Sequence, residues 1–329
     1  DKLVTGVQTC ALPISGACPV SLWDYHQATK AQIAKVEIDR TKLKRAYADL
    51  VVSDRMLDQI GPAIIAQSSI FMYGPSGNGK TSLAERMLRV YDDTVLIPYA
   101  VEVDSQIVSL FDPVVHHPVE NQDENMDQRW IRCKRPFVVV GGELVPSMLE
   151  LRLDEGSGVY AAPLQMKANN GILVIDDFGR QLMSPRDLLN RWIVPLDRRV
   201  DYLTLRYGVK FQIPFQLMVV FSTNLDPADL ADEAFLRRIQ NKIYVDPIDE
   251  ASFDEVFARV TRARKIEAPP GASAYLRQLC MTEGRKELRA CYPYDICNLL
   301  LAIGRYEGRP PQLTRVDLDR KSTRLNSSH

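Results

Sequence analysis

A glycine-rich segment has the residue types and the spacing of a phosphate-binding loop: Gly74, Pro75, Ser76, Gly77, Asn78, Gly79, Lys80 and Thr81. Glycines at these positions let successive backbone N–H groups turn inward around an anion. The apolar run Ile70–Tyr73 precedes the segment, and the helical pattern Ser82–Val90 follows it, with its positive end toward the phosphates. We expect the segment and Ser82 to hold a nucleoside triphosphate, with Lys80 on its β- and γ-phosphates and Thr81 on Mg²⁺.

Two carboxylates follow a second apolar run further along the chain. The run Ile172–Ile175 ends in Asp176 and Asp177. A strand that ends beside a phosphate loop brings its carboxylate to the magnesium ion, so we assign Asp176 to Mg²⁺. Asp177 is then the residue that orients or deprotonates the attacking water. By itself the pattern would suit an acidic turn after a core strand equally well.

Polar residues also follow a third apolar run, Met218–Phe221. If this strand lies between the other two, a side chain at its end reaches the γ-phosphate or the water. Asn224 is the first candidate for this role and Thr223 the second. The alternative is a turn from Asn224 to Pro227, since Asn and Asp-Pro favour turns.

An arginine pair, Arg237 and Arg238, ends a charged segment that begins at Asp232. Arginine is always charged and suits phosphate, so the pair could reach the nucleotide of an adjacent subunit. The alternative is a surface ion pair with Asp232 or Glu233. The residues alone leave both open.

Short apolar strands alternate with helical patterns, which predicts an α/β fold with a parallel sheet. The expected strands are Ile70–Tyr73, Val95–Val103, Ile172–Ile175, Leu217–Phe221 and Lys242–Val245. Residues 112–160 contain prolines, glycines and the apolar run Phe137–Val140, and we interpret them as an insertion. Arg199–Ile213 alternates around Tyr207-Gly208 and predicts a β-hairpin.

Helical patterns occupy both flanks of this region. Trp23 to about Leu50 reads as helical, and Ser53 begins a short helix that ends near Gly61. After Pro247, helices are expected at 251–266, 273–283 and 295–306. Basic residues in the first flank suit either a nucleic-acid arm or a solvated helix face, and acidic neighbours favour the face. They are Lys30, Lys35, Arg40, Lys42, Lys44 and Arg45.

Composition excludes several classes of protein. The chain has 329 residues and a net charge of −1, so its overall charge does not indicate nucleic acid or an anionic membrane. No apolar run approaches the length of a membrane span. Its cysteines form no Cys-x-x-Cys pair, which favours reduced thiols and a cytoplasmic location. The pair His116-His117 has no metal-ligand spacing.

Both ends read as foreign to the fold. Residues 1–15 and 321–329 resemble translated sequencing-adapter DNA, and we set them aside. The remaining chain is expected to divide into a helical linker (16–60), a nucleotide-binding α/β domain (61–247) and a helical lid (248–320).

In this order, the motifs resemble those of an AAA+ ATPase over about Leu50 to Asp319. The phosphate loop matches Walker A, Ile172–Asp177 matches Walker B, Asn224 matches sensor 1, and Arg237 or Arg238 matches the arginine finger. The resemblance implies a three-layer α/β/α P-loop fold with strand order 5-1-4-3-2 and a C-terminal helical lid. It also implies a homo-oligomer, such as a hexameric ring, that binds ATP and Mg²⁺.

The hairpin before the sensor strand resembles the pre-sensor-1 branch that includes the MoxR-like ATPases. Segments such as Asp177–Gln181 resemble an uncharacterised bacterial group described as predicted ATPases with chaperone activity. Asp177 replaces the usual Glu, and Tyr294 stands where the sensor 2 motif has Arg, unless Arg289 substitutes. An aromatic–apolar–glycine pore loop is not evident after the second strand.

These implications favour an ATPase that hydrolyses ATP at a subunit interface and remodels an unknown protein client. One alternative is a DNA-directed loader or helicase accessory, supported only by the basic helix. Another is a slow nucleotide-gated switch, which Asp177 and Tyr294 favour.

Overall fold

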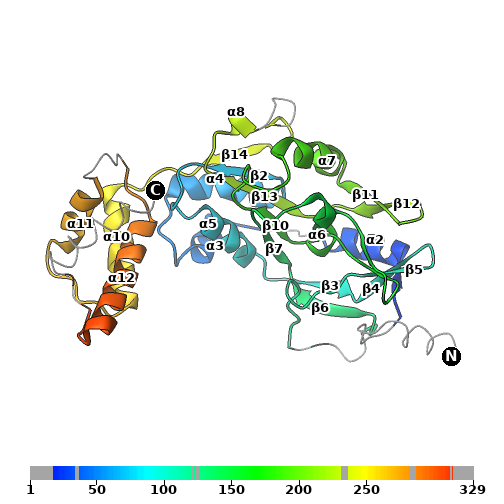
Figure 1. Cartoon of the computed structure of the whole chain (residues 1–329), viewed down its shortest axis with the longest axis horizontal. Coiled ribbons are helices and arrows are strands. Elements are labelled where there is room, and N and C mark those ends of the chain that lie inside the picture. The colour runs from blue at the N-terminus through cyan, green and yellow to red at the C-terminus, as the bar shows by residue number, and fades with distance from the viewer. Residues whose placement is uncertain are drawn as a thin grey trace.

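The computed structural model describes residues 18–33, 37–120, 122, 126–230, 236–281, 287–311 and 313. Five parallel strands form the central sheet, in the spatial order β14-β2-β13-β10-β7 (Figure 1). They are β2 (Ile70–Tyr73), β7 (Phe137–Val140), β10 (Ile172–Ile175), β13 (Met218–Thr223) and β14 (Asn241–Tyr244). Numbered along the chain, this order is 5-1-4-3-2, which confirms the expected fold class. The segments 1–17 and 314–329, which include both adapter-like ends, lie outside the described residues.

Helices cover both faces of the central sheet. Side chains alternate across a strand, so Ile70 and Met72 face one layer while Phe71 faces the other. The first layer consists of α3 (Arg40–Ala46), α4 (Asp54–Ile65), α5 (Lys80–Met87) and the 3₁₀ turn η1 (Leu88–Val90). The second is α7 (Pro185–Arg198), whose Trp192 is fully buried against Phe215 and Phe221. Because both faces of the sheet are covered, its strands are continuous apolar runs without polar alternation.

The second strand of the central sheet is not the one expected. Val95–Val103 forms two strands, β3 (Thr94–Pro98) and β4 (Ala100–Val103), and both pair outside the central sheet. Phe137–Val140, predicted within an insertion, is instead the edge strand β7 and pairs with β10. Both runs are apolar enough for a buried strand, so only pairing distinguishes them. The loop that follows β7 begins Gly-Gly-Glu-Leu-Val at 141 and contains no aromatic residue there.

The chain segments before and after β7 contribute strands to a second sheet, which has its own hydrophobic core. Its order is β1-β4-β5-β9-β8, with β1 (Val20–Ser21), β5 (Gln106–Ser109), β8 (Arg152–Asp154) and β9 (Val159–Ala161). β6 (Trp130–Lys134) pairs with β3. The 3₁₀ turn η2 (Pro146–Leu149) joins β7 to β8, and α6 (Leu164–Lys167) leads from β9 to β10. The predicted hairpin is present as β11 (Val200–Thr204) and β12 (Lys210–Pro214), and it packs its apolar face on this core (Figure 1).

The N-terminal flank is divided between the two cores rather than forming one linker. α2 (Leu22–Ala31) lies with the second sheet, where the Tyr25 hydroxyl accepts a 2.7 Å bond from Asn169. α3 and α4 pack on the central sheet. The predicted stop near Gly61 is wrong, because α4 continues through Pro62 to Ile65. Burial of Ile60 and Ile64 offsets the backbone hydrogen bond that proline cannot make.

Three helices after the central sheet form the lid, seen to one side of the α/β body in Figure 1. They are α10 (Glu250–Ala263), α11 (Ala272–Met281) and α12 (Cys291–Glu307), and they share a separate core. α12 begins at Cys291, earlier than expected, since proline is tolerated in the first turn and Pro293 lies there. This early start brings the helix N-terminus to the phosphate loop.

Candidate functional site

The phosphate loop joins β2 to α5 in the predicted strand–loop–helix arrangement. Gly74, Gly77 and Gly79 all have positive φ, at 137°, 82° and 80°. Such angles are strained for any residue with a Cβ. The N-cap of α5 is Gly79, which has no side chain to occupy the first N–H groups of the helix. These groups remain available to an anion.

Lys80 is folded back onto its own loop. Its Nζ donates to the carbonyl oxygens of Gly74 at 3.0 Å and Pro75 at 3.1 Å. Burial lowers the pKa of the ammonium, whereas Asp176 and Asp177 act to raise it. The ammonium therefore lies within electrostatic reach of both predicted carboxylates, and phosphate oxygens could replace its two carbonyl partners.

The predicted magnesium ligands meet across two elements. Thr81, in the first turn of α5, donates its hydroxyl to Asp176 Oδ2 at 2.7 Å. Asp176 directly follows β10, which β13 separates from β2 in the sheet. An octahedral Mg²⁺ holds adjacent oxygen ligands about 2.9 Å apart, so the observed pair fits two positions on one ion. The described residues contain no group of three or more His, Cys, Asp or Glu side chains placed to bind a metal, so phosphate and water would supply the other ligands.

Asp177 occupies a strained turn at the end of β10. Its φ is 49°, in the left-handed region that residues other than glycine rarely adopt. The side chain is exposed, and its N–H donates to Asp176 Oδ1 at 3.0 Å. The turn closes on Gly179, where an added Cβ would lie 2.6 Å from Leu230. Backbone strain of this kind gathers at functional sites.

The end of β13 lies between β2 and β10, as predicted for the sensor strand. Asn224 Oδ1 is buried and accepts no hydrogen bond from any described residue. Thr223 is committed elsewhere, because its hydroxyl donates to Phe178 O at 2.7 Å and accepts from Leu225 N at 3.1 Å. Between the two candidates, Asn224 therefore has an atom still able to bind a ligand or water.

The arginine pair follows β13 and precedes β14. Arg237 is exposed, and Arg238 forms a 2.8 Å ion pair with Asp197 of α7. Asp232 and Glu233 lie outside the described residues. An ion pair between partly exposed side chains contributes about 0–1 kcal/mol, so Arg238 could change partners at little cost.

The lid contacts the phosphate loop through the residues that begin α12. Cys291 N donates to Gly77 O at 3.0 Å, and Ala290 N donates to Asn78 Oδ1 at 3.3 Å. An added Cβ at Gly77 would lie 2.6 Å from Cys291 Sγ, so only glycine permits this approach. Burial raises the pKa of the Cys291 thiol to about 11, so it packs as a neutral group. Sequence reasoning missed this contact, and no local signal indicates it.

Of the two sensor 2 candidates, Arg289 rather than Tyr294 has a hydrogen bond to the phosphate loop. Arg289 Nη1 forms a long 3.4 Å hydrogen bond with Ser76 Oγ and helps to lower the pKa of Lys80. Tyr294 is 53% exposed, and its ring lies 4.2 Å beneath the guanidinium carbon of Arg264. The positions of the two side chains therefore favour Arg289 as the candidate for the sensor 2 role.

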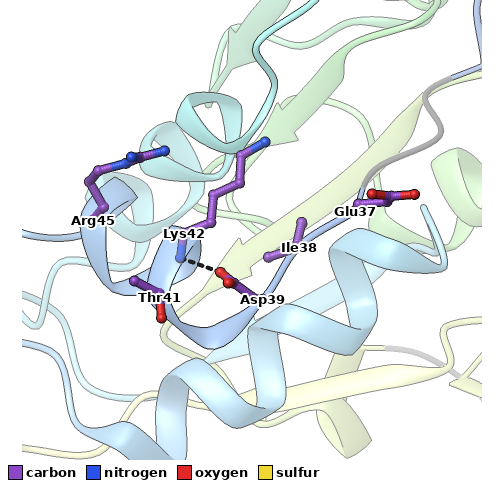
Figure 2. Close-up of a pocket in the computed structure, with 6 residues that line it drawn as sticks. All are labelled: Glu37, Ile38, Asp39, Thr41, Lys42 and Arg45. Carbon is purple, nitrogen blue, oxygen red and sulfur yellow. Dashed lines mark hydrogen bonds between the residues drawn. The ribbon is translucent and has the colours of Figure 1, made fainter.

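A shallow pocket at the start of α3 is separate from this site (Figure 2). Its lining mixes acids and bases and contains no residue of the predicted site. The lining residues are Glu37, Ile38, Asp39, Thr41, Lys42 and Arg45. Figure 2 shows Lys42 N bonded to Asp39, which is the N-cap interaction of α3 at 2.6 Å. We assign the pocket no role.

Comparison with known proteins gives a family only for the lid region. Residues 249–320 match a domain of unknown function (DUF8689). No curated protein matches the chain. None of the helices in the described part of the chain combines the length and hydropathy that a bilayer span requires.

Two solved structures illustrate the distant likeness. NtrX from Brucella abortus in complex with ADP is 16% identical, with a TM-score of 0.43 over 80% of this chain and 61% of that one. A RuvB mutant from Thermotoga maritima is 12% identical, with a TM-score of 0.45 over 87% and 71%. The chain thus spans less than two thirds of the NtrX chain. The fold assignment rests on the order of the strands in the sheet. The proposals below rest on the contacts at the site.

Proposed function

We propose that this chain is an AAA+ ATPase that binds ATP with Mg²⁺ at the phosphate loop and hydrolyses it. The observation that carries the proposal is the 2.7 Å contact between Thr81 and Asp176. The contact brings one oxygen from α5 and one from the end of β10 together beside the phosphate loop. Lys80 of this loop lies within electrostatic reach of Asp176 and Asp177. A bound Mg²⁺ would neutralise charge on the phosphates, with Thr81 and Asp176 as its protein ligands. The remaining site residues act on phosphate and water.

In this proposal, each residue of the site has a separate task. The loop N–H groups and Lys80 hold the phosphates, and Asp177 orients the attacking water or accepts its proton. Asn224 donates its amide N–H to the γ-phosphate, or accepts from the attacking water through its buried Oδ1, which has no hydrogen-bond partner among the described residues. Arg289 supplies a second positive charge from the lid side of the loop.

The proposal includes a shared site in a homo-oligomer, with a hexameric ring as the expected form. Arg237 and Arg238 are the candidates to reach the nucleotide of an adjacent subunit. The exposure of Arg237 and the weak ion pair of Arg238 are compatible with that task. Remodelling of a protein client in the cytoplasm is the activity that we infer for the assembly, on the resemblance of the motifs.

A nucleic-acid partner is the weaker alternative. Three of the four basic residues of α3 are paired with acids, among them Lys44 with Asp54 at 2.7 Å and Lys42 with Asp92 at 2.6 Å. Arg40 likewise contacts Asp58. Paired cations release few counterions on binding a phosphate backbone. The face therefore suits solvent better than nucleic acid.

Steady-state ATP hydrolysis, measured with the oligomer mass, tests the proposal. We expect turnover that requires Mg²⁺, and an Asp177→Asn variant that still binds ATP but hydrolyses it at least about 100-fold more slowly. The same substitution at Asp187, which accepts a hydrogen bond from Ser184, the N-cap of α7, is the matched control. Unaltered hydrolysis by Asp177→Asn would contradict the assignment. A burst of one ADP per subunit without turnover would instead favour a nucleotide-gated switch.

A further inference from the structure

The side chain of Gln181 bridges the two ends of the turn that carries the carboxylates. Its Nε2 donates to Asp176 O at 2.8 Å, and its Oε1 accepts from Gly179 N at 2.8 Å. In a closed four-residue turn, the first carbonyl and the fourth N–H bond to each other directly. Here one amide stands between them, so Gln181 replaces that bond and sets the width of the turn.

The width of this turn determines the backbone conformation of Asp177, which is unfavourable without such a restraint. Asp177 lies inside the bridged span with a φ of 49°, and a left-handed residue other than glycine costs about 1–3 kcal/mol. Such a conformation persists only where the surroundings over-determine it. Its restraints are therefore the groups that decide where the Asp177 carboxylate points.

Two hydrogen bonds hold Phe178, inside the turn, from the sheet side. Phe178 N donates to Ser222 O at 2.7 Å, and the Thr223 hydroxyl donates to Phe178 O at the same distance. Backbone hydrogen bonds from Asp176 N to Val140 O at 2.8 Å and from Arg180 N to Asp177 O at 2.9 Å hold other residues of the turn, but neither joins Asp176 to Gly179. Gln181 alone, among the side chains of the described residues with hydrogen bonds to this turn, joins its two ends. Neither of its two hydrogen bonds involves a residue of the phosphate loop.

We propose that Gln181 is a positioning residue for hydrolysis, acting through the bridged turn on Asp177. The inference rests on the proposed ATPase function and gives a role to a residue to which the motif comparison assigned none. Because the bridge holds the carboxylate that acts on water and not the loop that binds phosphate, its loss changes turnover and leaves nucleotide binding intact.

Two substitutions at Gln181 separate the bridge from simple packing. Gln181→Met keeps the length and volume but removes both hydrogen bonds, and Gln181→Ala removes the bonds and the volume. We expect both variants to lower kcat about tenfold, with KM for ATP and the Kd of a fluorescent ATP analogue within about twofold of the wild-type values. Gln212→Ala, on the exposed side of β12, is the matched control and should keep the wild-type kcat.

The possible outcomes distinguish a failure of the inference about Gln181 from a failure of the proposed function. Wild-type kcat in Gln181→Met would overturn the inference while the proposed function stands. A parallel loss of kcat, nucleotide affinity and Tm would overturn it as well, because that pattern indicates a general loss of structure. A wild-type chain that binds ATP without turnover would overturn the proposed function, and the inference with it.

Discussion

The phosphate loop and the turn Asp176–Gly179, called the carboxylate turn below, meet at the contact between Thr81 and Asp176 but keep their shapes for different reasons. The loop takes its shape from three glycines with positive φ and from the start of α5, all contiguous in the chain. The turn at Asp176–Gly179 contains one glycine and depends on Gln181, Ser222 and Thr223. We therefore propose that a local backbone motif binds the phosphates, and that a turn held by Gln181 and by contacts from β13 takes part in catalysis.

This difference has a physical basis. Phosphate binding requires only N–H groups and a cation, which a short glycine-rich segment can present by itself. Placing a carboxylate against a water requires one fixed direction, and about 1 Å of error is costly. Such accuracy comes from groups packed around the turn, not from the turn itself. We therefore expect substitutions in the phosphate loop to weaken nucleotide binding, and substitutions around the carboxylate turn to lower kcat.

The largest effect is expected from Lys80→Ala on the loop side. It removes the ammonium that lies among Gly74 O, Pro75 O and the two carboxylates. We expect nucleotide binding to weaken about 100-fold, which is about 2.7 kcal/mol, as measured by equilibrium titration. The matched control is Lys210→Ala on the exposed face of β12. Wild-type affinity in Lys80→Ala would show that the loop does not bind phosphate through this residue.

Arg289→Ala tests whether the loop is as self-contained as its backbone suggests. Arg289 contacts Ser76 from the lid, and a hydrogen bond to a charged group contributes about 1.5–3 kcal/mol. We expect about a tenfold loss in kcat/KM for ATP. Tyr294→Ala, four residues into α12 and directed away from the loop, should leave kcat/KM unchanged. The reverse ranking would mean that Tyr294 fills the sensor 2 role.

Thr223→Val is expected to give the smallest effect, on the turn side. Valine keeps the shape but leaves Phe178 O without the threonine hydroxyl, and Leu225 N loses its acceptor. The unfolding free energy should fall by about 1–2 kcal/mol, and kcat should fall about threefold with KM unchanged. Denaturant unfolding and steady-state kinetics measure the two quantities. Thr223→Ser, which keeps the hydroxyl, should restore both, and a failure to restore them would point to the lost methyl group instead.

Much of the fold could be predicted from the order of apolar runs. β2, β10, β13 and β14 lie where the runs indicated, because a strand covered on both faces has no polar alternation. The second strand could not be predicted, since Val95–Val103 and Phe137–Val140 have the same apolar character. Only pairing with β10 selects the latter.

The site, like the fold, has one part that the local sequence predicts and another that only tertiary contacts bring together. The chain by itself determined the phosphate loop, because its glycines and its following helix act within one short segment. Tertiary structure brought Asp176 to Thr81, turned Tyr294 away and placed Arg289 beside Ser76. Each of these contacts joins residues far apart in the chain. Their distance depends on sheet order and on where α12 begins, and neither property is written in the local pattern of residues.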